Sequence, residues 1–174
     1  MNTKLNDACF EKSCSLTKRA IKSLYAFFTD TLNKPGFTKA FSLLTLDNII
    51  VLDYACRVID ESNPDVTRTK EYKDCEAEMS KLLDQFGDRD SQGKLKRDEN
   101  GNVIIGEQLL EFNEAKAKFD AAHTTIMERL ENNNVMIDAF LNEEMTITLV
   151  LFNKFGDYPD NLPPSIISIL EKLY

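Results

Sequence analysis

Apolar residues recur at spacings of three and four along most of the chain, and this is the period of amphipathic α-helices. The pattern predicts a mainly α-helical fold in which short polar breaks separate the helices. The apolar residues 37–44 are expected to form a connection, and residues 135–140 a short extended segment. The predicted helices are at about 15–32, 46–61, 70–86, 107–131 and 143–155, with a last one opening at Pro164 or Ser165 and running to Tyr174.

Two of these helices, at about 70–86 and 107–131, have narrow apolar seams of similar spacing and are joined by a compact link. They are therefore predicted to form an antiparallel helical hairpin that packs with the further helices. In the link, a turn that ends in Asn100-Gly101 separates two short β-competent runs, which is a strong β-hairpin signal. We therefore expect a small β-hairpin at about 93–106, at the tip of the pair. No internal repeat was identified.

Charge is distributed unevenly along this acidic chain, whose formal net charge is -8. Residues 1–40 hold seven basic and three acidic residues, so they are predicted to form a basic N-terminal helical segment or arm. Residues 41–174 would then form the α-helical domain. The acidic balance argues against nucleic-acid binding, because phosphates repel it. No run approaches 18 apolar residues, so no membrane association is expected.

Two features suggest a protein-binding surface. A basic end on an acidic body can steer contact with an acidic partner, including a second copy of the chain, although a solvated helix face would look the same. Residues 35–52 are more apolar than one amphipathic face requires, so they either wrap around the core or join an interface. The candidate partner-binding residues are Lys18, Arg19, Lys22, Phe37, Phe41 and Leu44.

A calcium-binding loop is a weaker candidate. Asp88, Asp90, Gln92, Lys94 and Glu99 stand at relative positions 1, 3, 5, 7 and 12 of an EF-hand loop. However, Gln92 replaces the usual acid or Asn, Lys94 brings a positive charge, and the turn after Glu99 prevents a following helix. A polar turn is the favoured interpretation, and neither a metal nor another cofactor is predicted.

Catalytic chemistry has little support in this sequence. Cys75 and His123 occupy seam positions on the two facing helices, and a thiolate beside an imidazole can be a nucleophile. Core packing is the more common role of such residues, and no third group is placed to orient them. The chain also lacks a Gly-rich phosphate loop and a Gly-x-Ser-x-Gly elbow. We therefore predict that the protein is not an enzyme.

The order of several polar stretches carries a family resemblance. These stretches are Asp88-Arg89-Asp90-Ser91-Gln92-Gly93, Asp98-Glu99-Asn100-Gly101-Asn102 and Asn132-Asn133-Asn134-Val135-Met136-Ile137-Asp138. With the helices around them, roughly residues 46–155 resemble a group of small proteins encoded by tailed bacteriophages, often near tail or virion genes. The resemblance implies a phage accessory or virion component and brings no catalytic residues with it.

Together these observations favour a non-enzymatic phage protein that acts by protein–protein contact. It would be a virion component of the tail or head, or an assembly factor, present in the host cytoplasm during assembly or in the virion itself. Its partners would be other virion proteins or further copies in a homo-oligomer. One alternative is an inhibitor that binds a host protein through its acidic surface. A second alternative is a small enzyme of unknown reaction that uses Cys75 and His123.

Overall fold

A computed structural model describes residues 8–32 and 34–174 of this chain. The chain divides into two compact units, of which unit 1 holds residues 1–63 and 137–174 and unit 2 holds residues 64–136. The fold is mainly helical, as predicted, with a small two-stranded antiparallel sheet in addition. The predicted boundary near residue 40 differs from this division, because the N-terminal segment pairs with a C-terminal strand inside unit 1.

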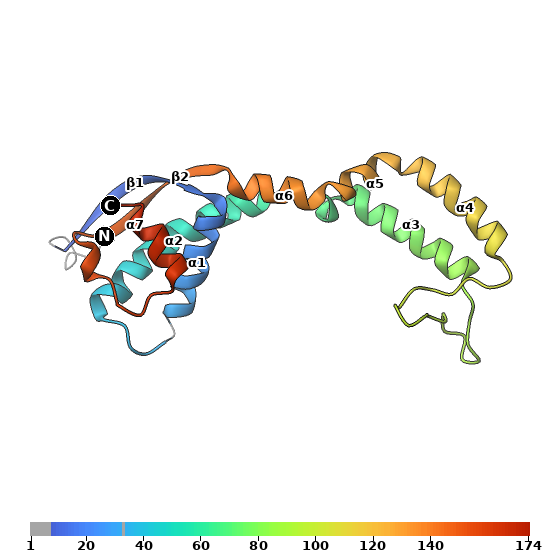
Figure 1. Cartoon of the computed structure of the whole chain (residues 1–174), viewed down its shortest axis with the longest axis horizontal. Coiled ribbons are helices and arrows are strands. Elements are labelled where there is room, and N and C mark those ends of the chain that lie inside the picture. The colour runs from blue at the N-terminus through green and yellow to red at the C-terminus, as the bar shows by residue number, and fades with distance from the viewer. Residues whose placement is uncertain (1–7, 33) are drawn as a thin grey trace. The chain divides into compact units, whose positions relative to one another are not determined.

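The sheet of unit 1 consists of β1 (Cys9–Thr17) and β2 (Glu144–Phe152), which pair antiparallel over their full lengths (Figure 1). Strand β2 corrects the sequence-based prediction of a helix over residues 143–155. Strand β1 overlaps only the first three residues of the helix predicted at 15–32, which is confirmed over residues 18–31. Short apolar runs fit the helical and the strand period alike, and β-branched residues such as Ile147 and Val150 favour the strand. Pairing between the two distant segments decides the outcome.

The helices of unit 1 are set by their caps. Helix α1 (Lys18–Thr31) follows β1 directly, and its N-cap Thr17 accepts a 3.2 Å hydrogen bond from the Ala20 N–H. Helix α2 (Lys39–Glu61) begins well before the predicted residue 46, because Thr38 accepts a bond from the Phe41 N–H. The predicted connection over residues 37–44 was therefore mostly wrong. A 3₁₀ turn η2 (Phe155–Asp157) precedes α7 (Pro164–Glu171), which confirms the predicted last helix.

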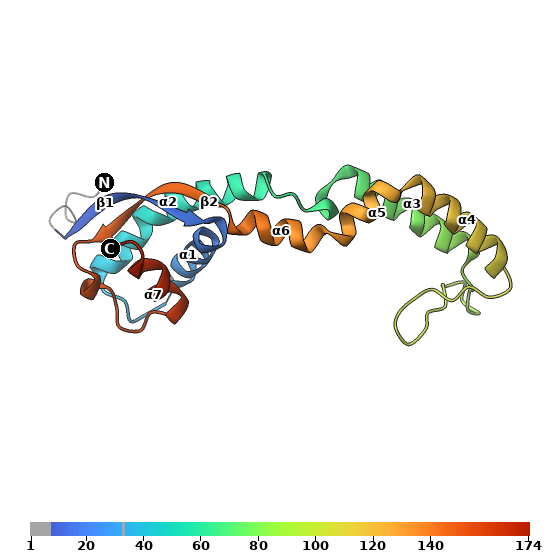
Figure 2. The same cartoon turned by 45° about the horizontal axis from the view of Figure 1, so that its top comes forward.

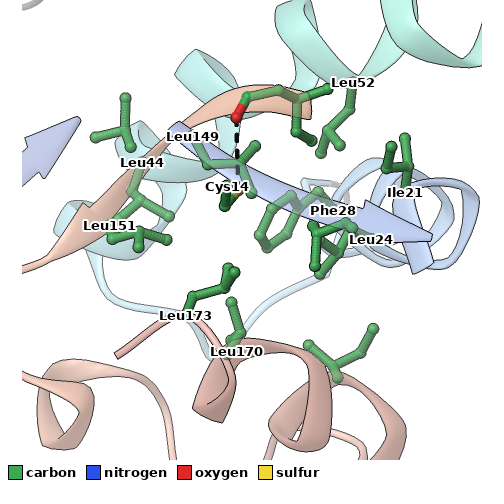
Figure 3. Close-up of a cluster of buried hydrophobic side chains, with 14 of the residues drawn as sticks. Cys14, Ile21, Leu24, Phe28, Leu44, Leu52, Leu149, Leu151, Leu170 and Leu173 are labelled. Atoms are coloured by element: carbon green, nitrogen blue, oxygen red, sulfur yellow. Dashed lines mark hydrogen bonds between the residues drawn. The ribbon is translucent and has the colours of Figure 1, made fainter. Parts of the chain in front are cut away.

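The core of unit 1 lies between one face of the sheet and the three helices (Figure 3). From the sheet, Cys14, Leu149 and Leu151 point into this core, and the Cys14 thiol donates a 3.5 Å hydrogen bond to the Ile147 carbonyl. The helices contribute large aliphatic and aromatic side chains that are almost fully buried. These are Ile21, Leu24 and Phe28 of α1, Leu44 and Leu52 of α2, and Leu170 of α7.

Unit 2 contains η1 (Val66–Arg68), α3 (Lys70–Phe86), α4 (Leu109–Ala122) and α5 (Thr124–Glu131). Helix α3 has the predicted bounds, whereas the predicted helix 107–131 is interrupted at His123. Helices α3 and α4 lie side by side in Figures 1 and 2. The small hydrophobic core that they share with α5 has Cys75 of α3, Phe119 of α4 and Ile126 of α5 as its buried members.

Helix α6 (Asn133–Asn142) begins in unit 2 and ends in unit 1. The extended segment predicted at 135–140 was therefore wrong. Consecutive asparagines commonly break helices, but the buried Asn133 has tertiary hydrogen bonds that keep its position. Its amide oxygen accepts from the Val66 N–H at 2.9 Å, and its amide nitrogen donates to Asp65 at 3.0 Å.

The tip between α3 and α4 contains two eight-residue repeats that the sequence analysis missed. Residues 89–96 and 97–104 both follow the pattern Arg-Asp-x-x-Gly. Each repeat closes one isolated bridge, Arg89 to Leu95 and Arg97 to Val103, so the β-hairpin expected at 93–106 is not confirmed as a pair of continuous strands. Gly101 does adopt the predicted left-handed conformation, with φ at 84°.

A ring of backbone hydrogen bonds closes the base of the tip at residues eight apart in sequence. The Lys96 N–H donates to the Asp88 carbonyl at 2.8 Å, the Ile104 N–H to Lys96 at 3.0 Å, and the Asp88 N–H to Ile104 at 2.8 Å. Gly87 lies directly before the ring residue Asp88. Leu95 and Val103 hold the equivalent places before Lys96 and Ile104. A Cβ at position 87 would lie 2.6 Å from the Leu95 side chain and 2.7 Å from that of Val103, so only glycine fits there.

The Asp98 carboxylate organises the second repeat. It accepts the Asn102 side-chain amide at 3.1 Å and the backbone N–H groups of Asn100 and Asn102 at 2.9 and 2.8 Å. These bonds, with the Asn102 side chain first, hold the pKa of Asp98 below its usual range. Because the folded pKa lies below the unfolded pKa, this stabilisation is present above the unfolded value. It is lost as the pH falls through the folded value.

Replacing Asn102 by alanine is expected to raise the pKa of Asp98, because it removes the largest of these contributions. A carboxyl titration followed by NMR measures the shift. Asn100→Ala is the matched control, since Asn100 supplies only its backbone N–H to Asp98. An unchanged Asp98 titration in Asn102→Ala would contradict this account.

Candidate functional site

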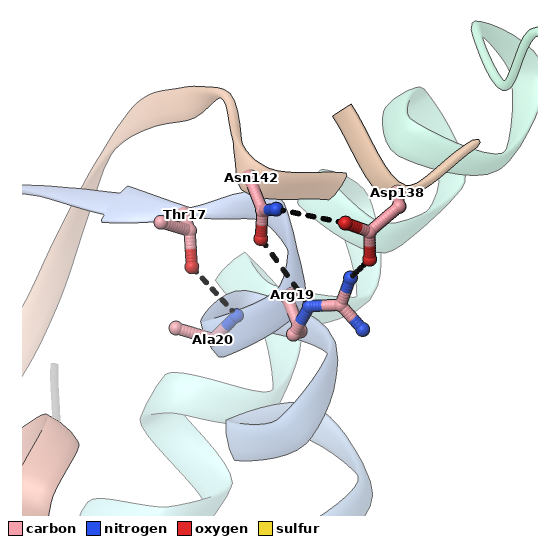
Figure 4. A network of polar contacts seen from close by, with 5 residues as sticks. All are labelled: Thr17, Arg19, Ala20, Asp138 and Asn142. Carbon is pink, nitrogen blue, oxygen red and sulfur yellow. Dashed lines mark hydrogen bonds and ion pairs between the residues drawn. The ribbon is translucent and has the colours of Figure 1, made fainter. Parts of the chain in front are cut away.

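Arg19, the first of the predicted partner-binding residues, lies at the start of α1 and has partners within unit 1. Its guanidinium donates to the Asp138 carboxylate and, at 3.4 Å, to the Asn142 side chain, as Figure 4 shows. The Asn142 amide also donates to Asp138 at 3.3 Å. The acidic partner compensates a cation at a helix N-terminus, where the dipole disfavours positive charge. Arg19 thus ties α1 to the end of α6.

The other two basic residues make similar contacts. The Lys18 ammonium lies 2.6 Å from the Glu143 carboxylate and 3.5 Å from the centre of the Phe140 ring. The Lys22 ammonium lies 2.7 Å from the Asp60 carboxylate. Lys18, Arg19 and Lys22, three of the basic residues that suggested a separate arm, therefore neutralise acidic groups of the same unit. Lys4 lies outside the described residues.

The predicted apolar contact residues lie mainly in the core. Phe41 is 1% exposed and Leu44 is fully buried, so neither can contact a partner in the folded chain, which corrects their assignment to an interface. Phe37 is half-buried, with its ring centre 5.1 Å from that of Phe41. Residues 35–52 were expected either to wrap around the core or to join an interface. The side chains of Phe37, Phe41 and Leu44 wrap around the core.

The opposite side of α2 carries an exposed apolar stripe. Leu46, Ile50 and Tyr54 are 48%, 73% and 67% exposed, and their four-residue spacing places them on one face. We name this stripe the outer face of α2. A helix on the surface of a monomer normally presents polar residues there. In the sequence, this stripe was signalled only by the apolar excess of residues 35–52. The start of the helix at Lys39 is needed to show which of these residues point outward.

An apolar groove of about 380 Å³ lies within unit 2, between α3 and the α4–α5 pair. Its walls are mainly hydrophobic, with Glu76 and Ser80 as the polar members. The residues that line it are Tyr72, Cys75, Glu76, Met79, Ser80, Leu83, Phe119, Met127 and Leu130. The groove can accept an apolar side chain, but it does not bring together a set of acid and base groups.

The two members of the proposed nucleophile pair have other partners. His123 Nε2 lies 2.9 Å from a Glu78 carboxylate oxygen, and the His123 ring packs 4.5 Å from that of Phe119. Cys75 is buried, and burial together with the nearby Glu78 charge raises the pKa of its thiol. A thiol that stays protonated is a weak nucleophile. The histidine is thus engaged with Glu78, and the thiol with the small core.

The carboxylates of the predicted calcium loop face backbone amides. Asp90 accepts from the N–H groups of Gln92 and Lys94 at 2.8 and 3.0 Å, and Asp88 accepts from Gly106 at 3.2 Å. Among residues 8–32 and 34–174, no three His, Cys, Asp or Glu side chains are grouped so that they could hold a metal ion. Asp90 therefore closes a local turn, and Asp88 accepts a bond from the far end of the tip.

In the part of the chain that the structure describes, every helix is too short or too polar to cross a membrane. Comparisons with protein-family models, with curated proteins and with solved structures each found no match. Function is therefore inferred from the residues and geometry of this chain, and the outer face of α2 is the candidate site.

Proposed function

We propose that this chain is a non-enzymatic phage protein that acts by protein–protein contact through the outer face of α2. The observation that carries this proposal is the exposed stripe of Leu46, Ile50 and Tyr54. Removing apolar surface from water contributes roughly 25 cal/mol per Å², so a partner that covers the stripe gains binding free energy. Contiguous apolar patches on otherwise polar surfaces commonly mark such sites.

Two further observations support the proposal. The resemblance of roughly residues 46–155 to small tailed-bacteriophage proteins favours a role in or around the virion, as a tail or head component or as an assembly factor. The raised pKa of the Cys75 thiol and the pairing of His123 with Glu78 weaken the enzymatic alternative. The protein would act in the host cytoplasm during assembly or remain in the particle.

The test introduces Ile50→Glu into the phage genome that encodes the chain. A carboxylate at the centre of the outer face should prevent contact with an apolar partner, so we expect the yield of complete particles to fall at least about tenfold. Ala26→Glu is the matched control, because it adds the same charge at an exposed position of α1. Both variants should accumulate to the wild-type level in infected cells.

Quantitative mass spectrometry of purified particles distinguishes the two roles. A fixed copy number of the chain supports a virion component, whereas its absence from particles together with the loss of yield supports an assembly factor. A wild-type yield of Ile50→Glu particles that contain as much of the chain as wild-type particles do would overturn the proposal.

A further inference from the structure

We propose that the partner at the outer face of α2 is the α2 helix of a second copy, antiparallel and related by a twofold axis at Ile50. This inference rests on the proposed contact function and names its occupant. It follows from the symmetry of the residues along the helix, from their charges and from their exposure.

The outer face is symmetric about Ile50 when it is followed along α2. Positions along this side of the helix occur at spacings of four, three, four, four, three and four residues, and this series is the same from either end. The positions are Lys39, Leu43, Leu46, Ile50, Tyr54, Arg57 and Glu61. Leu43 is half-buried against the core of unit 1, and the other six are exposed. Residues 39, 50 and 61 are eleven apart, a period that keeps a stripe nearly straight along an α-helix. Two copies can therefore align these faces along the helix.

An antiparallel pair centred on Ile50 brings matching chemistry together. Ile50, the most exposed large apolar residue of the stripe, meets its own copy at the axis, and Leu46 meets Tyr54 on both sides. Because a twofold contact uses the same patch on both molecules, each favourable layer away from the axis occurs twice. At the next layer, Arg57 meets the exposed part of the half-buried Leu43, which the aliphatic stem of Arg57 can cover while its guanidinium stays paired with Asp53.

The charges at the two ends of α2 select the direction. In the antiparallel pair, the exposed Lys39 of each copy lies opposite the exposed Glu61 of the other. In a parallel pair, Lys39 would face Lys39 and Glu61 would face Glu61, which is repulsive. The outer face thus favours a second copy in one orientation.

Cysteine cross-linking tests the register directly. Ile50→Cys should cross-link to its own copy under mild oxidation, because the two residues meet at the axis. Leu46→Cys should not, since positions 46 and 46 lie eight residues apart along the pair, or about 12 Å, beyond disulfide reach. A mixture of Leu46→Cys and Tyr54→Cys should give a mixed dimer, although neither variant does so alone. The four native cysteines are buried.

Sedimentation of the full-length protein measures the association itself. We expect a dimer that Ile50→Glu converts to a monomer and that Lys39→Glu weakens at least about tenfold. The double variant Lys39→Glu with Glu61→Lys should recover the wild-type affinity, a rescue that a merely structural defect would not show. The changed side chains are exposed, so each variant should fold like the wild-type protein. Circular dichroism checks this.

Two results would overturn the inference. Efficient cross-linking of Leu46→Cys and of Tyr54→Cys, each alone, would mean a parallel pair. A wild-type protein that stays monomeric at the highest attainable concentration would mean that a second copy is not the partner. If Ile50→Glu still lowers particle yield in that case, the proposed function stands and the occupant is another virion protein.

Discussion

Replacing Phe41 by alanine is expected to lower the free energy of unfolding of unit 1 by about 3–5 kcal/mol. The Phe41 side chain is 1% exposed, and its ring contacts those of Phe28, Phe37 and Tyr158, at centre distances of 6.2, 5.1 and 6.3 Å. Alanine would remove this apolar contact and leave a cavity in a closely packed core. The loss is a large fraction of the 5–15 kcal/mol by which domains are typically stable.

Urea denaturation followed by circular dichroism measures this loss. Ile50→Ala is the matched control on the opposite side of the same helix, and in dilute solution it should change stability by no more than about 0.5 kcal/mol. Equal losses for the two variants would mean that the inner and outer faces of α2 are wrongly assigned.

Replacing Asn48 by alanine should cost unit 1 about 2–5 kcal/mol, because two backbone groups would lose their partners together. Asn48 is 1% exposed, and its amide pairs with one residue of β2 in both directions. The Asn48 nitrogen donates to the Val150 carbonyl at 2.8 Å, and the Val150 N–H donates to the Asn48 oxygen at 2.8 Å. The amide thereby satisfies the free edge of the strand, where neither backbone group reaches water. Urea denaturation measures the cost, and hydrogen exchange at Val150 should accelerate.

Asn48→Asp provides a control of nearly identical shape. A protonated acid can make both bonds, whereas a carboxylate cannot donate to the Val150 carbonyl, and burial raises the pKa of such a group. The stability of this variant should therefore fall as the pH rises through its raised folded pKa. If the free energy of unfolding of Asn48→Asp equalled that of the wild-type protein at every pH, the pairing of Asn48 with Val150 would be contradicted.

The sequence predicts elements whose signals are local. The bounds of α3, the start of α7 near Pro164 and the left-handed Gly101 all follow from neighbouring residues. Strand β2 does not, because its apolar run suits either period until β1, more than a hundred residues away, pairs with it. The break at His123 and the helical Asn133 likewise depend on tertiary contacts.

The candidate site shows a similar limit. Without the cap at Thr38, residues 37–44 could not be assigned to α2, and the helical phase that separates Phe41 from Ile50 stayed hidden. The repeats of the tip escaped notice because they share only Arg, Asp and Gly in identical positions, while the remaining residues differ. Their equivalence emerges from the matching turns at Gly93 and Gly101.

The ring at the base of the tip limits how this segment can change in evolution. Exposed loops usually tolerate insertions and deletions. Here the three ring positions, Asp88, Lys96 and Ile104, use one another's backbone groups in a closed cycle, so a third copy of the repeat would add a fourth corner that the cycle cannot hold. Duplication or loss of one eight-residue repeat is therefore expected to be selected against. Length variation should be confined to the bends at residues 91–92 and 99–100.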